Sequence, residues 1–337
     1  MAKSPPETGF FQTRQQVWEH YQHPLQQVED RISKTLDSQG HLIANIGKYI
    51  LNGGGKRIRP LLAIIASNLD GERNFGEAVI LIASAVELIH TTSLLHDDVI
   101  DDAVKRRNKD SARIIWGNKA SILVGDHLYA QGVSIAESLR DHAINDIFLE
   151  ACRLMTEGET LQLTYHRNLD FTEEIYFRII KCKTAALISA TCRLSGMVAK
   201  MEPEKQEMLA QFGLQLGSAY QIVDDALDYI GNSQIWGKFL GKDLRDGEIT
   251  LPLLHLLSRC GKEERKKVEE ALRTGKVSHK ALLQILNLMR QYKSIEYSMN
   301  KARESVEAAK VNLCSFPDSI HRQALLYLAN YVILRDH

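Results

Sequence analysis

The fold is decided by the stretch AVILIASAVELIHTTSLLHDDVID, residues 78–101, in which an apolar run leads directly into an acidic cluster. Its apolar residues recur at helical rather than alternating spacing, so we predict a helix over about Phe75–Asp101. On that helix Asp97 and Asp101 are four residues apart and share one face, where like charges repel. Carboxylates beside so much apolar surface are costly to bury unless they are paired or bind a metal.

A second cluster of the same form, Asp224-Asp225-Ala226-Leu227-Asp228, follows the apolar stretch Tyr220–Val223. Hard divalent cations such as Mg²⁺ take carboxylate oxygens and commonly share their remaining positions with substrate phosphates. The two clusters therefore predict a pocket of facing helices in which metal ions bind an anionic ligand. For either cluster alone, a solvated acidic helix face is the alternative.

The remainder of the chain predicts an all-α protein. Proline is absent between Pro60 and Pro203, and no strand-like alternation bounded by turn residues stands out, so a sheet is not expected. We expect a helical extension over residues 1–39 and one continuous helical domain over 40–337. The other expected helices are Gln12–Ser38, Gly40–Leu51, Arg59–Leu69, Ala112–Leu139, Ala143–Gln162, Glu173–Met197, Glu204–Tyr229, Pro252–Ser258, Glu263–Gly275, His279–Leu288, Ser294–Val311 and Ser319–Leu334.

Composition excludes several classes of function. With 42 acidic and 42 basic residues the net charge is zero, so no global field attracts nucleic acid or an anionic membrane. The longest apolar run is interrupted by Glu87 and His90, which argues against a membrane span. Five cysteines without CxxC spacing, and a polar, proline-containing start over Met1–Gly9, predict a cytoplasmic protein with reduced thiols.

A glycine-rich loop, NGGGKRIRP over Asn52–Pro60, supplies candidate anion-binding groups. Glycines let backbone amides approach an anion, and Lys56, Arg57 and Arg59 offer charge-assisted donors to phosphate. The loop is not a P-loop, because no GK[ST] follows at the required spacing. A helix-connecting turn with solvated charges is the alternative.

Further polar residues lie near the acidic clusters. Lys105-Arg106-Arg107 follows the first cluster, where an ion pair with Asp101 or Asp102 is the simpler interpretation. His90 and His96, the two histidines before that cluster, could each be a hydrogen-bonded core residue or a donor to a diphosphate. The remaining candidates are Lys183-Thr184, Lys238 and Lys242-Asp243.

These motifs, taken in order, resemble the trans-type polyprenyl diphosphate synthases, and the long-chain branch (octaprenyl or heptaprenyl diphosphate synthases) in particular. The resemblance covers about Gly40 to Arg335. It is carried by GGGKRIRP (53–60), HTTSLLHDDVIDD (90–102), Arg106-Arg107, WGNKASILVGD (116–126), EGETLQ (157–162), Lys183-Thr184, QIVDDALD (221–228) and LANYV (328–332).

The resemblance implies a helical bundle of the isoprenoid synthase type with a central substrate cavity, and a homodimer. It implies an enzyme that joins isopentenyl diphosphate to an allylic diphosphate, with three Mg²⁺ ions per active site. Asp97, Asp101 and Asp224 would coordinate these ions, and Asp98, Asp225 and Asp228 would be auxiliary ligands. The allylic diphosphate would contact Arg106, Lys183, Thr184, Gln221 and Lys238, and isopentenyl diphosphate would contact Lys56, Arg59, His90 and Arg107.

Product length in the family depends on residues beneath the first acidic cluster. Thr92 and Ser93 lie about one turn before Asp97, and Ile89 lies one turn further down. Bulky aromatics there would stop the growing chain, so these small side chains predict a product of C30 to C50. The short-chain alternative is a farnesyl or geranylgeranyl diphosphate synthase, and the alternatives from other classes are a non-catalytic regulatory subunit and a terpene cyclase. Family members usually carry Lys at the position of Glu248, which predicts weaker allylic diphosphate binding here.

Overall fold

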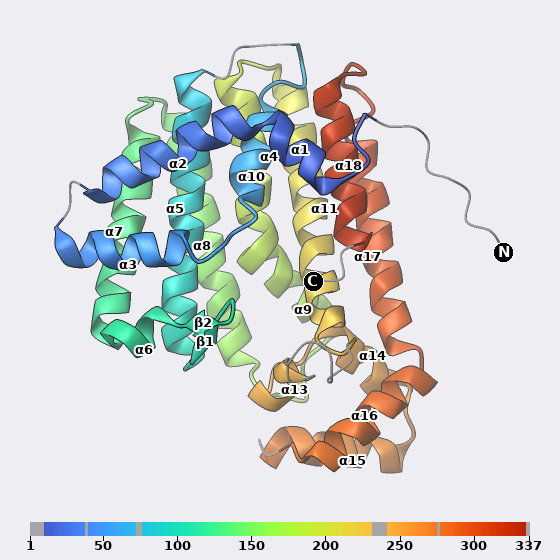
Figure 1. Cartoon of the computed structure of the whole chain (residues 1–337). Coiled ribbons are helices and arrows are strands. Elements are labelled where there is room, and N and C mark those ends of the chain that lie inside the picture. Colours follow the sequence, from blue (N-terminus) through green and yellow to red (C-terminus); the bar gives the residue numbers. More distant parts are fainter. Residues whose placement is uncertain (1–9, 38–39, 72–75, 231–240, 275–276, 335–337) are drawn as a thin grey trace. The chain divides into compact units, whose positions relative to one another are not determined.

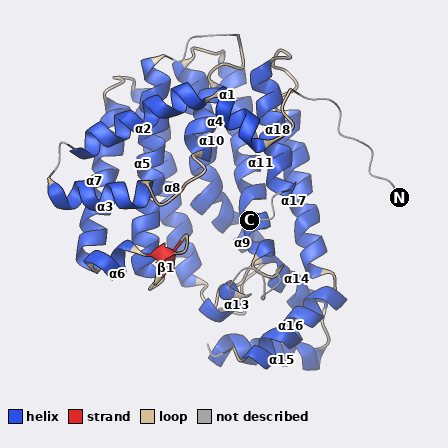
Figure 2. Cartoon of the chain, viewed as in Figure 1, coloured by secondary structure: helices blue, strands red, loops and turns tan. Residues whose placement is uncertain are grey.

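The computed structural model describes residues 10–37, 40–71, 76–230, 241–274 and 277–334. Helices dominate throughout this part of the chain (Figure 2), so the all-α prediction is confirmed. The chain forms two compact units. Unit 1 comprises Met1–Cys152, Ala190–Ala210 and Leu313–Tyr327, and unit 2 comprises Arg153–Ser189, Gln211–Asn312 and Leu328–His337.

The elements follow the chain in the order labelled in Figure 1. The first half contains α1 (Arg14–His20), α2 (Gln22–Asp37), α3 (His41–Leu51), α4 (Ile58–Ala66), α5 (Glu77–Ile100), β1 (Lys105–Arg106), β2 (Lys109–Asp110), α6 (Ala112–Trp116), α7 (Asn118–Glu137) and α8 (His142–Thr164). The second half contains α9 (Glu173–Ile180), the π-helical turn η1 (Lys181–Ala185), α10 (Ala186–Val198), α11 (Pro203–Leu227), α13 (Lys242–Asp246), α14 (Leu251–Arg259), α15 (Lys262–Thr274), α16 (His279–Gln291), α17 (Ser294–Val311) and α18 (Ile320–Leu334).

Helix α5 is the core of unit 1. It packs against α2, α4, α6 and α7, and α2 runs across both α4 and α5 (Figure 1). Its length and apolar composition would allow it to cross a membrane, but 78% of that stretch is buried inside the structure. Glu87, one of the two polar interruptions, is buried within the unit and ion-paired to Arg57. We conclude that α5 is a core helix, as the interrupted run predicts.

A close approach between α5 and α7 needs a glycine. A Cβ on Gly132 would lie 3.1 Å from Ile89 Cδ1 and 3.2 Å from the Ala85 carbonyl oxygen, tighter than ordinary packing. Without a side chain at this point, α7 lies directly against the part of α5 that precedes the first acidic cluster.

In unit 2, α14 packs against α9, α16 and α17. Helix α11 approaches η1 closely, because a Cβ on Gly217 would lie 2.6 Å from Ala185 Cα. This contact brings the last turns of α11, which carry the second acidic cluster, beside the turn that carries Lys183 and Thr184.

Several predicted helices are interrupted, and each break has a local cause. The predicted helix Gln12–Ser38 is two helices separated at Tyr21, because Pro24 is tolerated only in the first turn of a helix. The predicted helix Ala112–Leu139 breaks at Gly117, whose φ of 84° suits glycine.

A short β-ladder, β1 paired antiparallel with β2, also departs from the prediction that no sheet forms. The two residues of its turn, Arg107 and Asn108, have φ values of 50° and 64°. Two positive φ values are typical of a tight hairpin turn. An Arg-Asn pair is a weaker signal for such a turn than Asn-Gly, which is why the sequence did not reveal it.

Candidate active site

The first acidic cluster lies at the C-terminal end of α5 in unit 1. Asp101 is exposed and Asp97 is half-buried, whereas the side chain of Asp98 is only 1% exposed. Arg106 Nε donates to Asp98 Oδ1 at 2.8 Å. The expected ion pair between the basic run and Asp101 or Asp102 is therefore wrong for Arg106, because the hairpin directs its side chain to Asp98. Asp102 instead accepts from Arg113 Nη2 at 2.6 Å.

A group of basic side chains surrounds Glu87 and His90 in the same unit. Burial raises the pKa of Glu87, and the charges of Arg57, Arg59 and Arg107 oppose that rise. Burial lowers the pKa of His90 well below its usual range, and the charges of Arg59 and Arg107 lower it further. His90 is therefore neutral at pH 7. The structure thus brings together three of the four residues predicted to bind isopentenyl diphosphate: Arg59, His90 and Arg107.

Lys56, the fourth, lies in the loop before α4. Its carbonyl oxygen accepts a hydrogen bond from Trp18 Nε1 at 2.8 Å. Next to it, a Cβ on Gly55 would lie 2.9 Å from Arg57 Nη1 and 3.1 Å from Arg107 Nη1. Glycine at this position lets the loop backbone lie directly against two guanidinium groups.

The three predicted chain-length residues differ in exposure. Thr92 is buried and its Oγ1 donates to the carbonyl of Gly125 at 3.1 Å, so it belongs to the α5–α7 contact. Ile89 is buried against Gly132 in the same contact. Ser93 is partly exposed, and its Oγ donates to the His90 carbonyl at 2.9 Å. Ser93 is therefore the most accessible of the three residues.

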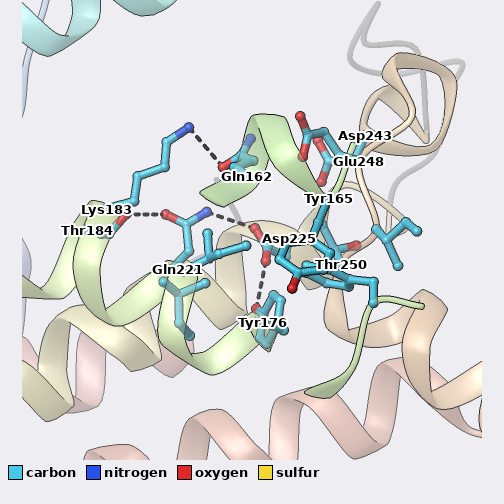
Figure 3. A pocket seen from close by; sticks show the side chains of 14 residues that line it. Gln162, Tyr165, Tyr176, Lys183, Thr184, Gln221, Asp225, Asp243, Glu248 and Thr250 are labelled. Atoms are coloured by element: carbon cyan, nitrogen blue, oxygen red, sulfur yellow. Dashed lines mark hydrogen bonds between the residues drawn. The ribbon is translucent and has the colours of Figure 1, made fainter. Parts of the chain in front are cut away.

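Asp225 of the second acidic cluster lines a pocket in unit 2, where side chains form a continuous hydrogen-bonded chain (Figure 3). Thr184 Oγ1 donates to Gln221 Oε1 at 2.8 Å, and Gln221 Nε2 donates to Asp225 Oδ1 at 2.8 Å. Tyr176 Oη donates to the other oxygen of Asp225 at 2.7 Å. Three predicted site residues, Thr184, Gln221 and Asp225, are therefore joined directly.

Lys183 faces the same pocket from η1 (Figure 3). Its Nζ donates to Gln162 Oε1 at 3.0 Å and lies 2.7 Å from Glu159 Oε2. A Cβ on Gly158 would lie 2.9 Å from Lys183 Cα, so glycine is needed for α8 to approach the π-helical turn. Such turns inside helices are frequent at functional sites.

Three carboxylates in or beside this pocket have raised pKa values. Burial raises the pKa of Asp225 to about 7, against the hydrogen bonds from Tyr176 and Gln221, which lower it. Burial also raises the pKa of Asp228, although its carboxylate accepts the backbone N–H groups of Lys242 at 3.1 Å and Asp243 at 3.0 Å. Burial, followed by the charges of Asp228 and Asp225, raises the pKa of Asp243. A hard cation would relieve this repulsion, so the donor set fits Mg²⁺.

To bind a metal ion, these carboxylates would have to move closer together or share the ion with oxygen atoms of the substrate. Among the residues that the structure describes, no three His, Cys, Asp or Glu side chains surround a common metal position. A Mg²⁺ ion that keeps water and phosphate ligands needs only one or two carboxylates, so this arrangement is compatible with it.

Glu248, for which the sequence predicts weaker allylic diphosphate binding, lines the same pocket (Figure 3). Its Oε1 lies 3.9 Å from His166 Nδ1. The candidate Lys242 pairs with Asp246, its Nζ lying 3.5 Å from Asp246 Oδ2. The predicted ligand Lys238 lies outside the described residues.

Sequence reasoning missed residues that the structure places at these sites. Tyr176 belongs to the pocket of unit 2, and Trp18 contacts the glycine-rich loop. Tyr176 had a signal, because it precedes Lys183 by seven residues, about two turns of one helix. Trp18 had none, because 38 residues separate it from its partner.

Comparison with known proteins identifies the class. Residues 40–289 match the polyprenyl synthetase family model. The chain is 39% identical over 309 residues to an octaprenyl diphosphate synthase of Escherichia coli (strain K12), covering 92% of this chain and 95% of that one. The chain therefore belongs to the polyprenyl synthetase family, which confirms the predicted family and an enzyme of this class.

Two solved structures show the same fold. A decaprenyl diphosphate synthase from Rhodobacter capsulatus superimposes with a TM-score of 0.91 at 33% identity, covering 96% of this chain and all of that one (100%). A polyprenyl synthase from Caulobacter crescentus CB15, complexed with calcium and isoprenyl diphosphate, gives a TM-score of 0.91 at 33% identity, covering 99% of this chain and 100% of that one. The isoprenoid synthase fold is thereby confirmed.

Proposed function

We propose that this chain elongates an allylic diphosphate by repeated trans condensation with isopentenyl diphosphate, giving a product of C30 to C50. The observation that carries the proposal is the hydrogen-bonded chain from Thr184 through Gln221 to Asp225. It joins two predicted diphosphate contacts to a predicted metal-binding carboxylate in one pocket. The similarity to octaprenyl and decaprenyl diphosphate synthases supports the class of reaction and a long product.

In this proposal both acidic clusters hold Mg²⁺, three ions in all, through Asp97, Asp101 and Asp224. When bound, Mg²⁺ supplies Lewis-acid stabilisation of the diphosphate. Asp98 is ion-paired to Arg106 and Asp225 is held by Tyr176 and Gln221, so these carboxylates act as auxiliary groups. Asp228, bound to two backbone amides, is the third auxiliary group.

The basic residues divide between the two substrates. Lys183, Thr184, Gln221, Arg106 and Lys238 would bind the allylic diphosphate, and Lys56, Arg59, His90 and Arg107 would bind isopentenyl diphosphate. Because His90 is neutral beside two arginines, it can donate only one ring N–H to a phosphate oxygen.

Reaction begins when the allylic carbon–oxygen bond breaks and the diphosphate departs, leaving an allylic cation. The double bond of isopentenyl diphosphate attacks that cation and forms the new carbon–carbon bond. Loss of a proton, accepted by the released diphosphate, gives the new trans double bond. Cations such as Lys183 stabilise the charge that builds on the leaving diphosphate, so no protein nucleophile is required.

The remaining proposals follow from the family. We propose a cytoplasmic homodimer in which α7 contributes to the interface, with the lipid product released toward a membrane. Exposed apolar residues of α7, Ile122 and Leu123, support a contact surface there, being 41% and 67% exposed.

The purified chain alone, supplied with Mg²⁺, farnesyl diphosphate and radiolabelled isopentenyl diphosphate, tests the proposal. We expect elongation that chelation of the metal abolishes and that Thr184→Val, which keeps the shape of Thr184 but removes its hydroxyl, weakens. Elongation only after a partner protein is added would support the regulatory-subunit alternative. A cyclic hydrocarbon product would support the terpene cyclase alternative.

A further inference from the structure

We propose that Trp18 and Glu29, on the two N-terminal helices α1 and α2, are positioning residues for the isopentenyl diphosphate half of the active site. Both helices precede residues 40–289, the part of the chain that matches the family model. The inference rests on the proposed function, in which Lys56 and Arg59 bind isopentenyl diphosphate.

The loop that carries Lys56 and leads into α4, where Arg59 lies, has an unfavourable backbone. Gly54 has a φ of 85°, and Arg57 has a φ of 47° although it is not glycine. A left-handed conformation disfavours residues with a side chain, so contacts elsewhere must hold Arg57 in place. The conformation of this loop therefore depends on contacts with other elements of the structure.

Arg57 is fixed by three partners from three different elements. Its Nη2 donates to the Leu51 carbonyl at 2.6 Å, at the end of α3. Its Nη1 donates to the buried Glu87 of α5 at 3.1 Å. Its Nε donates to Glu29 of α2 at 3.1 Å, so the N-terminal helix completes the set. The Arg57 side chain is only 15% exposed, which limits screening of these contacts by solvent.

The residue before it is fixed by α1. Trp18 Nε1 donates to the Lys56 carbonyl at 2.8 Å in a partly buried contact. Two successive loop residues, Lys56 and Arg57, are therefore each bound by one N-terminal helix. Trp18 and Glu29 bind the Lys56 carbonyl and the Arg57 side chain, so they act on the backbone next to the predicted substrate-binding side chains.

Preorganisation of this loop affects one substrate and not the other. A loop that must be ordered on binding weakens affinity for its ligand, because the ordering free energy is lost from binding. We therefore expect Trp18→Phe to raise KM for isopentenyl diphosphate by about 3- to 10-fold, the range of one neutral hydrogen bond. Glu29→Gln should raise it by about 2- to 5-fold, the range of a partly exposed ion pair. KM for the allylic diphosphate should stay within about twofold of wild type, because its predicted ligands lie elsewhere.

Each variant has a matched control on its own helix. Glu19→Gln alters an exposed α1 residue that accepts from Gln15, and Asp30→Asn alters an exposed α2 residue that accepts from Gln26. Each of these two side chains accepts from a residue of its own helix, so both variants should leave both KM values unchanged. Trp18→Phe keeps an aromatic ring but removes the indole N–H together with part of the ring surface. Glu29→Gln is a half-exposed surface change that tests the same loop should Trp18→Phe fold poorly.

Steady-state kinetics of the full chain, with each substrate varied in turn, tests the inference. A rise in KM for isopentenyl diphosphate alone supports it. A lower Tm with both KM values unchanged would overturn it, because the contacts would then serve only to anchor the helices. Lys56→Ala, which keeps the carbonyl bound by Trp18, separates the two claims. If Lys56→Ala leaves KM for isopentenyl diphosphate unchanged, the substrate assignment in the proposed function fails. If Lys56→Ala raises this KM but Trp18→Phe and Glu29→Gln do not, only the positioning role of Trp18 and Glu29 fails.

Discussion

Tyr176→Phe removes the hydroxyl that donates to Asp225 Oδ2 at 2.7 Å and leaves the aromatic ring in place. A hydrogen bond to a charged group contributes about 1.5–3 kcal/mol, and one pKa unit corresponds to about 1.4 kcal/mol. Because this bond lowers the pKa of Asp225, which burial has raised to about 7, its loss should raise that pKa by about one to two units. At pH 7.5 Asp225 would change from mostly ionised to mostly protonated.

Elongation measured against pH at subsaturating Mg²⁺ detects this change. We expect the acidic limb of the pH–activity curve to move about one unit to higher pH, and half-maximal Mg²⁺ to rise about tenfold at pH 7.5. Tyr297→Phe is the matched control, because Tyr297 donates to the carboxylate of Glu173 at 2.8 Å outside the pocket lining. If Tyr176→Phe lowers activity without moving the limb or the Mg²⁺ requirement, Tyr176 does not act through Asp225.

Four further variants give independent tests. In the absence of Mg²⁺, Asp225→Asn should raise Tm at pH 8 but not at pH 4. Burial raises the folded-state pKa of Asp225 to about 7, so the ionised carboxylate makes the folded protein less stable as pH rises from about 4 to 7. Its elongation activity should fall, and an unchanged Tm at pH 8 would refute the electrostatic argument. Ser93→Phe should shorten the product on chromatography, whereas Thr92→Phe should lower the stability by about 1–3 kcal/mol because Thr92 is packed against α7. Identical behaviour of the two variants would contradict this assignment. Glu248→Lys should lower the allylic KM by about two- to fivefold, and an unchanged or raised KM in steady-state assays would count against it.

Helical periodicity was sufficient to predict most of the fold. The predicted helix Phe75–Asp101 corresponds to α5, Glu77–Ile100, because one long apolar run fixes both its conformation and its burial. Periodicity could not locate the break at Tyr21, where Pro24 limits helix continuation, or the hairpin at Arg107 and Asn108. These features depend on one or two residues with special backbone geometry, and apolar spacing does not report them.

The candidate sites were predictable where a motif and its partners are close in sequence, and not where they are distant. The acidic clusters and Lys183-Thr184 were found as motifs, whereas their supporting contacts were not. The ion pair from Arg106 reaches Asp98 rather than Asp101 or Asp102, because the hairpin reverses the chain. Tyr176 reaches Asp225 across 49 residues of sequence, a contact that only the packing of α9 and α11 creates.

The length of the product formed by the purified chain tests the central claim most directly. The wild-type chain, incubated with Mg²⁺, farnesyl diphosphate and excess isopentenyl diphosphate, should yield a product that chromatographs among length standards between C30 and C50. A product that stops at C15 or C20 would contradict a long-chain synthase, and no elongation at all would contradict the proposed reaction itself.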